Sequence, residues 1–166
     1  DLSYAYNLNQ NHEIELNTIS WLHLITKLNS CRKFYLRKQD YPMVYTFLED
    51  HWESLIMEEV WEPGDNQYPA FAQELKTCMI LRDWINEIHE RNITETFQIG
   101  AGDLYRLINN AQWILRALRK IVDLDHPNWS SQMNELYSRV SYGIKANILP
   151  LIELRGIGRM RARKLY

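Results

Sequence analysis

One stretch of the chain, from Asp103 to Asp123, carries the strongest constraint on the fold. Its apolar side chains recur every three or four positions, which is the spacing of one face of an α-helix. Alternating apolar and polar residues, the pattern of a β-strand, are scarce throughout the chain. The sequence therefore predicts an all-α fold. The expected core-facing stripe consists of Leu104, Leu107, Ile108, Ala111, Leu115, Leu118 and Val122.

The face of this helix opposite the apolar stripe carries an aromatic residue between two cations. At about 100° per residue, Trp113 lies roughly opposite the middle of the stripe. Arg106 and Lys120 lie seven residues on either side of it, and Asn110 and Arg116 flank it. An indole among cations and amides is a surface on which an unpaired base can stack while phosphates are neutralised. The alternative is that a neighbouring helix covers Trp113.

Helical signals continue along the rest of the chain. Together they predict an all-α, multi-helix bundle of about six or seven helices. We expect a short turn around residues 94–97 and an N-terminal cap at Gly100-Ala101-Gly102-Asp103 rather than a phosphate loop. The further expected helices are Thr18–Leu28 capped by Asn17 or Thr18, Tyr41–Val60, Pro69–Glu90, a helix from Pro127-Asn128 to Tyr142 with Gly143 at its end, and Lys145–Leu154.

The C-terminal end has helix-hairpin-helix character. Gly156 and Gly158 permit a tight turn, and the amides of the helix that starts at Arg159 can meet a phosphate. Arg159 and Arg163 share one face of that helix, whereas Arg161 points nearly opposite, toward the bundle or a missing domain, in a domain-docking role. The last twelve residues hold five basic residues and no acidic one, while the other 154 hold 14 basic and 21 acidic residues. This asymmetry favours a polyanion held along one path, although a plain helix corner with a solvated basic face is the alternative.

Several classes of function are excluded or unsupported. The chain lacks a G-x-x-x-x-G-K-[ST] motif, so it cannot by itself be a P-loop ATPase. Its two cysteines are far apart, no His or acidic spacing indicates a metal site, and no apolar run reaches membrane-spanning length. We expect His23, within an apolar helix, to be a hydrogen-bonded core residue rather than a base. No catalytic residue, metal or cofactor is therefore assigned to this chain.

Three runs of residues form a recognisable set. They are ISWLHLI with FYLRKQDY (residues 19–25 and 34–41), LRDWINE with IGAGDL and AQW (81–87, 99–104 and 111–113), and GIGRMRARKLY (156–166). In order and spacing they resemble the patterns LLHLI…YLRxxDY, LLDWINE…GPGDL…AEW and PGIGRxRARxLY of archaeal HELQ-type (Hjm) helicases. These are superfamily 2 DNA helicases that act on replication forks. The set spans nearly the whole chain, with Ala101 and Arg155 standing where that family has proline.

The resemblance implies a division of the chain and a role for each part. Residues 1–18 would connect from a preceding winged-helix domain, 19–143 would be the helical ratchet bundle, and 144–166 would begin a helix-hairpin-helix domain. The chain also begins without methionine, so we expect it to be a piece of a longer protein. In such helicases an Arg and a Trp, seven residues apart on the central helix, stack on bases of the 3′ tail, and Arg106 and Trp113 stand at those positions.

The implied function is that of a single-stranded DNA-gripping domain in an ATP-dependent 3′–5′ DNA helicase of replication forks and DNA repair. ATP and Mg²⁺ would belong to motor domains elsewhere in the same chain. The implied partners are single-stranded or forked DNA, those motor domains, and replication or repair proteins, in the cytoplasm and away from membranes. The alternative is a protein- or RNA-interaction scaffold of an RNA-processing helicase. The sequence leaves open the preference between DNA and RNA.

Overall fold

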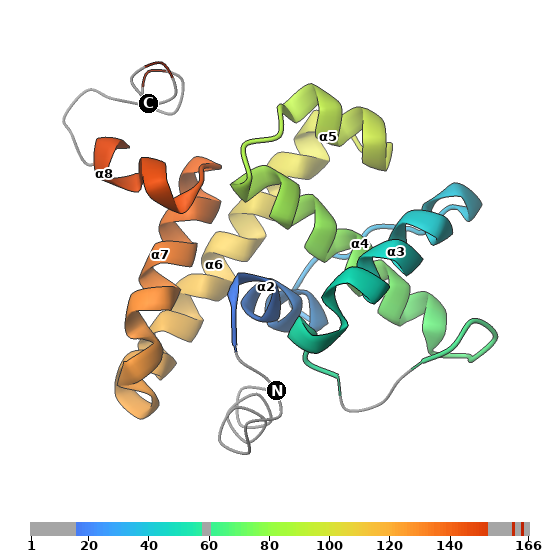
Figure 1. The fold of residues 1–166 in the computed structure, drawn as a ribbon, viewed down its shortest axis with the longest axis horizontal. Helices are drawn as coiled ribbons and strands as arrows, with labels where there is room; N and C mark the ends of the chain where they lie inside the picture. Colours follow the sequence, from blue (N-terminus) through green and yellow to red (C-terminus); the bar gives the residue numbers. More distant parts are fainter. Residues whose placement is uncertain (1–15, 58–60, 153–160, 162–163, 165–166) are drawn as a thin grey trace. The chain divides into compact units, whose positions relative to one another are not determined.

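The computed structural model describes residues 16–57, 61–152, 161 and 164. All regular structure in these residues is helical, in seven α-helices and four 3₁₀ turns, so the predicted all-α fold is confirmed (Figure 1). In chain order the elements are α2 (Thr18–Lys27), η1 (Lys38–Asp40), α3 (Tyr41–His51), η2 (Trp52–Ser54), α4 (Tyr68–Ile85), α5 (Glu90–Phe97), α6 (Ala101–Asp125), η3 (Pro127–Trp129), α7 (Ser130–Tyr142), η4 (Ala146–Ile148) and α8 (Leu149–Ile152).

The chain divides into two compact units, residues 1–80 and 81–166. The boundary falls inside α4, which begins in the first unit and ends in the second. Among the described residues, none of the helices has the length and apolarity that a membrane span requires. In the same residues, no group of three or more His, Cys, Asp or Glu side chains is placed to hold a metal ion.

In the first unit, α2 begins at the predicted cap. The side chain of Asn17 accepts hydrogen bonds from the backbone N–H groups of Ile19 and Ser20, and the Ser20 hydroxyl accepts one from the Asn17 N–H. This reciprocal pair satisfies donors that a helix start would otherwise leave unpaired. The residues that follow are buried without interruption from Ser20 to Thr26, so α2 is a central element of this unit.

A buried ion pair holds α4 to the start of α3 in the first unit. Lys76 Nζ lies 2.7 Å from Asp40 Oδ2, and both side chains are 2% exposed. The same ammonium donates to the carbonyl of Tyr35 at 3.1 Å, and the same carboxylate oxygen accepts from the Arg37 N–H at 2.7 Å. Both charges are therefore hydrogen-bonded as well as paired, which is what a buried ion pair requires.

The prediction of one helix from Tyr41 to Val60 is wrong, because α3 ends at His51. Beyond η2 the chain becomes extended and buries Leu55 and Ile56. The backbone groups of Ile56 then find tertiary partners: its N–H donates to His23 Nδ1 at 3.0 Å, and its carbonyl accepts from Lys27 Nζ at 3.1 Å. Burial and these two bonds replace the helical bonds that periodicity predicted.

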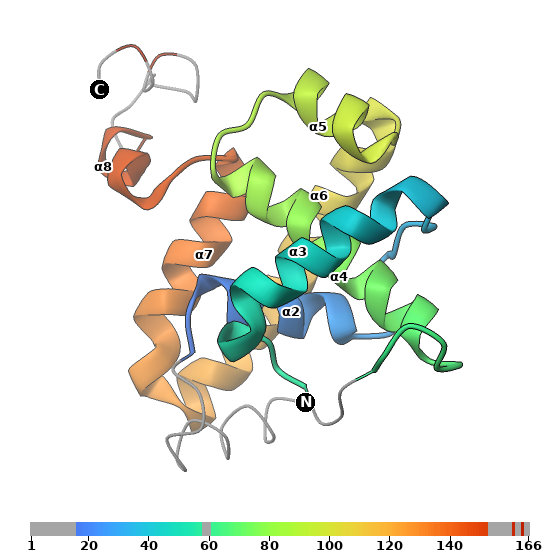
Figure 2. The same cartoon turned by 45° about the vertical axis from the view of Figure 1, so that its right-hand side comes forward.

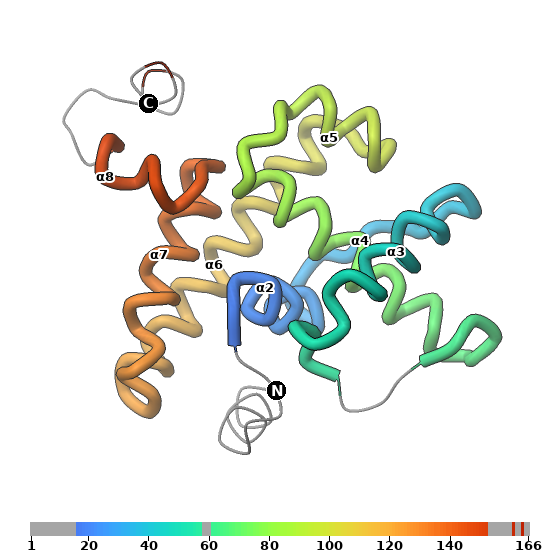
Figure 3. The backbone as a smooth tube through the Cα atoms, viewed as in Figure 1, coloured from blue at the N-terminus to red at the C-terminus, as the bar shows by residue number. Residues whose placement is uncertain are grey.

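The prediction of one helix from Pro69 to Glu90 is also wrong, because α4 ends at Ile85. Glu87 adopts a left-handed backbone conformation at φ 68°. Its N–H donates to the carbonyl of Trp84, and the N–H of Ile88 donates to that of Asp83. This is the Schellman arrangement, which usually contains glycine. The chain therefore turns and starts α5 where the sequence indicated only a short turn (Figure 3).

In the second unit, α6 and α7 lie side by side as the two longest helices of residues 90–152 (Figure 2). The indole N–H of Trp84 donates to the carbonyl of Val140 at 2.8 Å, and its ring meets that of Tyr105 edge-on at 6.2 Å. Tyr105 also donates to Glu90 at 2.7 Å, which holds α5 against α6. The two contacts of Tyr105 hold α6 against the end of α4 and against α5.

The end of α7 follows the prediction, with Gly143 in the left-handed region at φ 63°. We expect Gly143→Ala to lower the free energy of unfolding by about 1–2 kcal/mol, because a Cβ is strained at that φ. Urea denaturation measures the difference. Gly102→Ala is the control, since a Cβ there meets only Arg106 Nη2 at 3.9 Å. That variant should be neutral or gain up to about 1 kcal/mol. Equal losses in both variants would contradict this account.

Candidate nucleic-acid interface

The helix α6 begins at Ala101, within the predicted capping stretch and two residues before the predicted apolar stretch. Gly100 is its N-cap, and the carbonyl of Gly100 accepts from the N–H groups of Asp103 and Leu104. Asp103 lies in the first turn, where a carboxylate is stabilised by the helix dipole. All seven residues of the predicted apolar stripe are buried, and Ile114 is buried with them. The register of α6 is therefore fixed by its core-facing side.

Because the apolar stripe faces the core, the residues on the opposite side of α6 face outward. Trp113 is 62% exposed, so its predicted outward orientation is confirmed. Arg106 and Lys120 are exposed and Asn110 is half-buried. At 1.5 Å per residue the face from Arg106 to Lys120 is about 21 Å long. The structure therefore brings these four predicted site residues together along one helix.

The charge of this face is positive. Between residues 104 and 122 the helix contains three arginines and one lysine and no acidic residue. Arg106 is paired with Asp103 one turn earlier at 3.4 Å, but both side chains are partly in solvent, at 67% and 35% exposure. Such an exposed pair contributes little and does not hold the guanidinium against a competing phosphate. The surface combines an exposed aromatic ring with cations able to meet a polyanion.

The remaining predicted site residues belong to the C-terminal end. Gly156, Gly158, Arg159 and Arg163 lie outside the described residues. Arg161 is described and is exposed. Its predicted role in domain docking and the division of the chain at residues 18 and 143 stay predictions.

Sequence reasoning missed two residues beside this face, Arg119 and Tyr137. The Cζ atom of Arg119 lies 4.8 Å from the centroid of the Tyr137 ring, and Arg116 Nη2 donates to the Tyr137 hydroxyl at 3.2 Å. Arg119 is about 120° around the helix from Trp113, so the periodicity did not place it on the outward face. The spacing of Arg116 and Arg119 was a usable signal, whereas nothing in the sequence pairs them with Tyr137.

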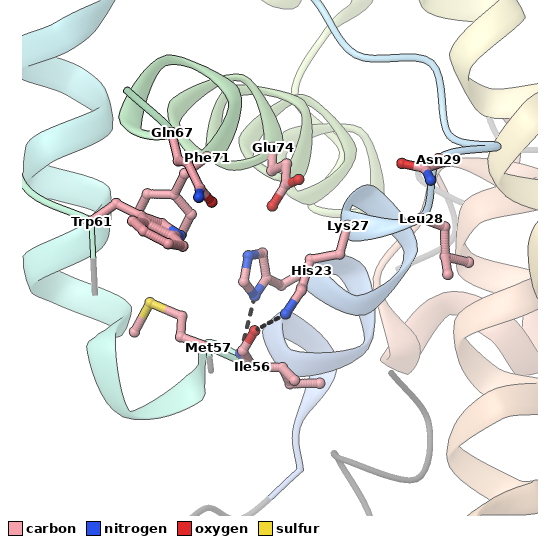
Figure 4. A pocket seen from close by; sticks show the side chains of 10 residues that line it. All are labelled: His23, Lys27, Leu28, Asn29, Ile56, Met57, Trp61, Gln67, Phe71 and Glu74. Atoms are coloured by element: carbon pink, nitrogen blue, oxygen red, sulfur yellow. Dashed lines mark hydrogen bonds between the residues drawn. The ribbon is translucent and has the colours of Figure 1, made fainter. Parts of the chain in front are cut away.

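A separate pocket of about 610 Å³ lies in the first unit (Figure 4). His23 is fully buried at its edge and, as predicted, is hydrogen-bonded, with Nδ1 accepting from the Ile56 N–H. Its ring meets that of Phe71 edge-on at 6.3 Å. Burial, together with the nearby charge of Lys27, lowers the pKa of His23 to about 3. His23 is therefore neutral at pH 7 and serves the core rather than proton transfer.

This burial makes stability depend on pH. In the unfolded chain a histidine takes up a proton near its ordinary pKa of about 6.5, whereas folded His23 does so only near 3. The unfolded state thus binds more protons in that window, and stability is lost as pH falls from about 6.5 to about 3. We expect His23→Gln, which keeps an acceptor for Ile56, to flatten the fall of unfolding free energy between pH 7 and pH 4. Urea denaturation at each pH measures the unfolding free energy. An equal fall of that free energy between pH 7 and pH 4 in the two proteins would contradict this expectation.

The chain is similar in sequence to known DNA helicases. Residues 19–143 match the family described as archaeal helicase, domain 4. The chain is 33% identical over 146 residues to an ATP-dependent DNA helicase Hel308 of Methanocella arvoryzae, which covers 87% of this chain and 20% of that protein. It is 35% identical over 130 residues to the Hel308 of Thermococcus kodakarensis (77% and 11%), and 34% identical over 156 residues to that of Pyrococcus horikoshii (93% and 21%). The chain thus spans about a fifth or less of these relatives.

Proposed function

Because this chain belongs to the archaeal helicase domain 4 family, we propose that it is the strand-gripping domain of an ATP-dependent 3′–5′ DNA helicase. The relatives that it matches are named ATP-dependent DNA helicases, which supports the class of the parent protein. The finer resemblance to HELQ-type (Hjm) enzymes is part of the same proposal. In this interpretation α6 is the helix along which single-stranded DNA lies.

The observation that carries the proposal is the exposed ring of Trp113 between two cations on one helix face. A base stacks on such a ring whatever its identity, because every base has a π-face. Arg106 and Lys120, two turns away on either side, are positioned to neutralise phosphates of the same strand. Trp113 is not covered within its own unit, which favours strand binding over the scaffold alternative.

The proposed work of this domain is mechanical. Trp113 would hold a base while motor domains of the same chain close and advance the strand, and would release it when they open. ATP and Mg²⁺ would bind those motor domains, since no P-loop motif occurs in this chain. Action at replication forks and in DNA repair, with partners from those processes, belongs to the proposal for the whole protein.

A binding titration tests the proposal. Fluorescence anisotropy of labelled dT₁₂, rU₁₂ and a blunt duplex measures affinity for single-stranded DNA, single-stranded RNA and double-stranded DNA at several salt concentrations. We expect dT₁₂ to bind in a salt-dependent manner and more tightly than the duplex, because only unpaired bases expose a face to Trp113. Preference for the duplex, or no binding of dT₁₂ at low salt, would overturn the proposal. Preference for rU₁₂ would replace DNA by RNA as the strand.

A further inference from the structure

Three cations gather on α6 just beyond Trp113, at Arg116, Arg119 and Lys120. None of them forms an ion pair with a carboxylate among the described residues. Other arginines of the same unit do have such partners: Arg91 pairs with Glu95 at 2.7 Å, and Arg139 with Glu135 at 3.6 Å. Cations that lie close together without counter-charges repel one another, which destabilises the fold, but they attract an anion.

Tyr137, on α7, organises two of these cations. Its hydroxyl oxygen accepts from Arg116 Nη2 at 3.2 Å, and its ring lies under the guanidinium of Arg119 at 4.8 Å. The hydrogen bond from Arg116 is the main cause of a lowered pKa at Tyr137. A side-chain hydrogen bond with Ser141 also lowers the pKa of Tyr137. Both guanidinium groups are thus held in position by the Tyr137 side chain, one at its hydroxyl and one over its ring.

One hydrogen-bond donor of Arg119 has no acceptor in the described part of the chain. The side chain is half-buried, and this donor is its buried Nε. A buried guanidinium donor without a partner is unfavourable, so packing of α6 against α7 does not by itself account for Arg119. The cluster therefore presents two guanidinium groups, positioned by Tyr137, to an anion with several acceptor oxygens. A phosphodiester has that chemistry.

The position of the cluster identifies which phosphodiester. Arg116 follows Trp113 by three residues, so the two side chains are neighbours on the helix surface, about 60° apart around its axis. We propose that Arg116, Arg119 and Tyr137 form a phosphate clamp that holds the backbone of the strand beside the base stacked on Trp113. The clamp rests on the proposed function, and it directs the strand from the outward face of α6 toward α7.

The competing explanation is that these side chains merely join α6 to α7. A structural role and a phosphate clamp differ in salt dependence. Removing one cation that neutralises a phosphate of a single strand lowers the log–log slope of affinity against salt by about 0.7. A role in packing alone would change the melting temperature and leave that slope as it is.

The test measures dT₁₂ affinity across a salt series for four variants. Arg116→Gln and Arg119→Gln are each expected to lower the slope by about 0.7. Tyr137→Phe keeps the ring under Arg119 and removes only the hydroxyl, so it should weaken binding about 2- to 10-fold at an unchanged slope. The matched control is Arg91→Gln on α5, an exposed arginine paired with Glu95, which should leave both quantities unchanged.

The outcomes separate the clamp from the function on which it rests. If Arg116→Gln and Arg119→Gln keep the wild-type slope while Trp113→Ala still weakens binding, the clamp is wrong and strand gripping stands. A slope lowered as much by Arg91→Gln would also overturn the clamp, because the effect would then be one of net charge. If the wild-type chain does not bind dT₁₂, the proposed function itself fails. If Arg119→Gln does not fold, the slope of Arg116→Gln, at an exposed position, and the affinity of Tyr137→Phe test the clamp.

Discussion

Replacement of Trp113 by alanine is expected to weaken binding of single-stranded DNA by about 1–3 kcal/mol, roughly 5- to 150-fold. The reason is that the indole is 62% exposed and offers the stacking surface between Arg106 and Lys120. The same exposure predicts that the melting temperature changes little, since the apolar stripe that packs α6 lies on the opposite side. Anisotropy titration with dT₁₂ and a thermal melt measure the two effects on one sample.

A second exposed tryptophan supplies the control. Trp52 is 44% exposed in the first unit, and its neighbours Glu49 and Glu53 are acidic. Trp52→Ala removes the same side chain from a surface that repels phosphate, so affinity for dT₁₂ should stay at the wild-type value. Trp113→Phe, which keeps a smaller ring, should fall between wild type and Trp113→Ala. A large loss of melting temperature with intact binding in Trp113→Ala would show that the ring serves packing.

The largest expected effect on stability comes from the buried pair of Lys76 and Asp40. Lys76→Met is expected to lower the free energy of unfolding by about 3–5 kcal/mol, because it leaves the carboxylate of Asp40 buried without its counter-charge. The Lys76 ammonium also donates a hydrogen bond to the carbonyl of Tyr35, so this carbonyl loses its donor in the variant. Urea denaturation at pH 7 measures the loss.

Two further variants separate charge burial from general damage. Asp40→Leu combined with Lys76→Met removes both charges, so part of the lost stability should return relative to Lys76→Met alone. Arg91→Gln breaks an ion pair whose side chains are 79% and 62% exposed, and it should change stability by less than about 1 kcal/mol. A loss in Lys76→Met no greater than that of Arg91→Gln would contradict the account of this pair.

Helical periodicity predicted α6 well because one of its sides is buried and the other is solvated. The seven stripe residues and the orientation of Trp113 follow directly from that contrast. In α4 the contrast is absent: every residue from Leu75 to Leu81 is buried, including Lys76 and Thr77. Where a helix is buried on all sides, its sequence shows no contrast between an apolar and a polar face. The spacing of residues therefore did not predict that Lys76 is buried or that Asp40 is its partner.

Helix ends were harder to predict than helix faces. Rules based on glycine and proline found the end of α7 at Gly143, but α4 ends where Glu87, not glycine, takes the left-handed conformation. No glycine or proline marks the end of α3 at His51. The helix ends there because the chain beyond it becomes extended and buries Leu55 and Ile56. Both misses are tertiary effects that override local propensity.

The candidate site shows the same division. Arg106, Asn110, Trp113 and Lys120 lie on one helix, so helix geometry alone brought them together. The pairing of Arg116 and Arg119 with Tyr137 joins residues 18–21 positions apart on two helices. Only the packing of α6 against α7 creates it, and a single sequence carries no direct trace of that packing.

The most direct test of strand gripping by α6 observes the ring of Trp113 itself. Indole N–H resonances of the chain, with Trp113 assigned from the Trp113→Phe variant, are followed by NMR during titration with dT₁₂. We predict that the Trp113 resonance shifts to saturation, while those of Trp21, Trp84 and Trp129, which are buried, move little. An unmoved Trp113 resonance at an oligonucleotide concentration that saturates binding by anisotropy would contradict the account.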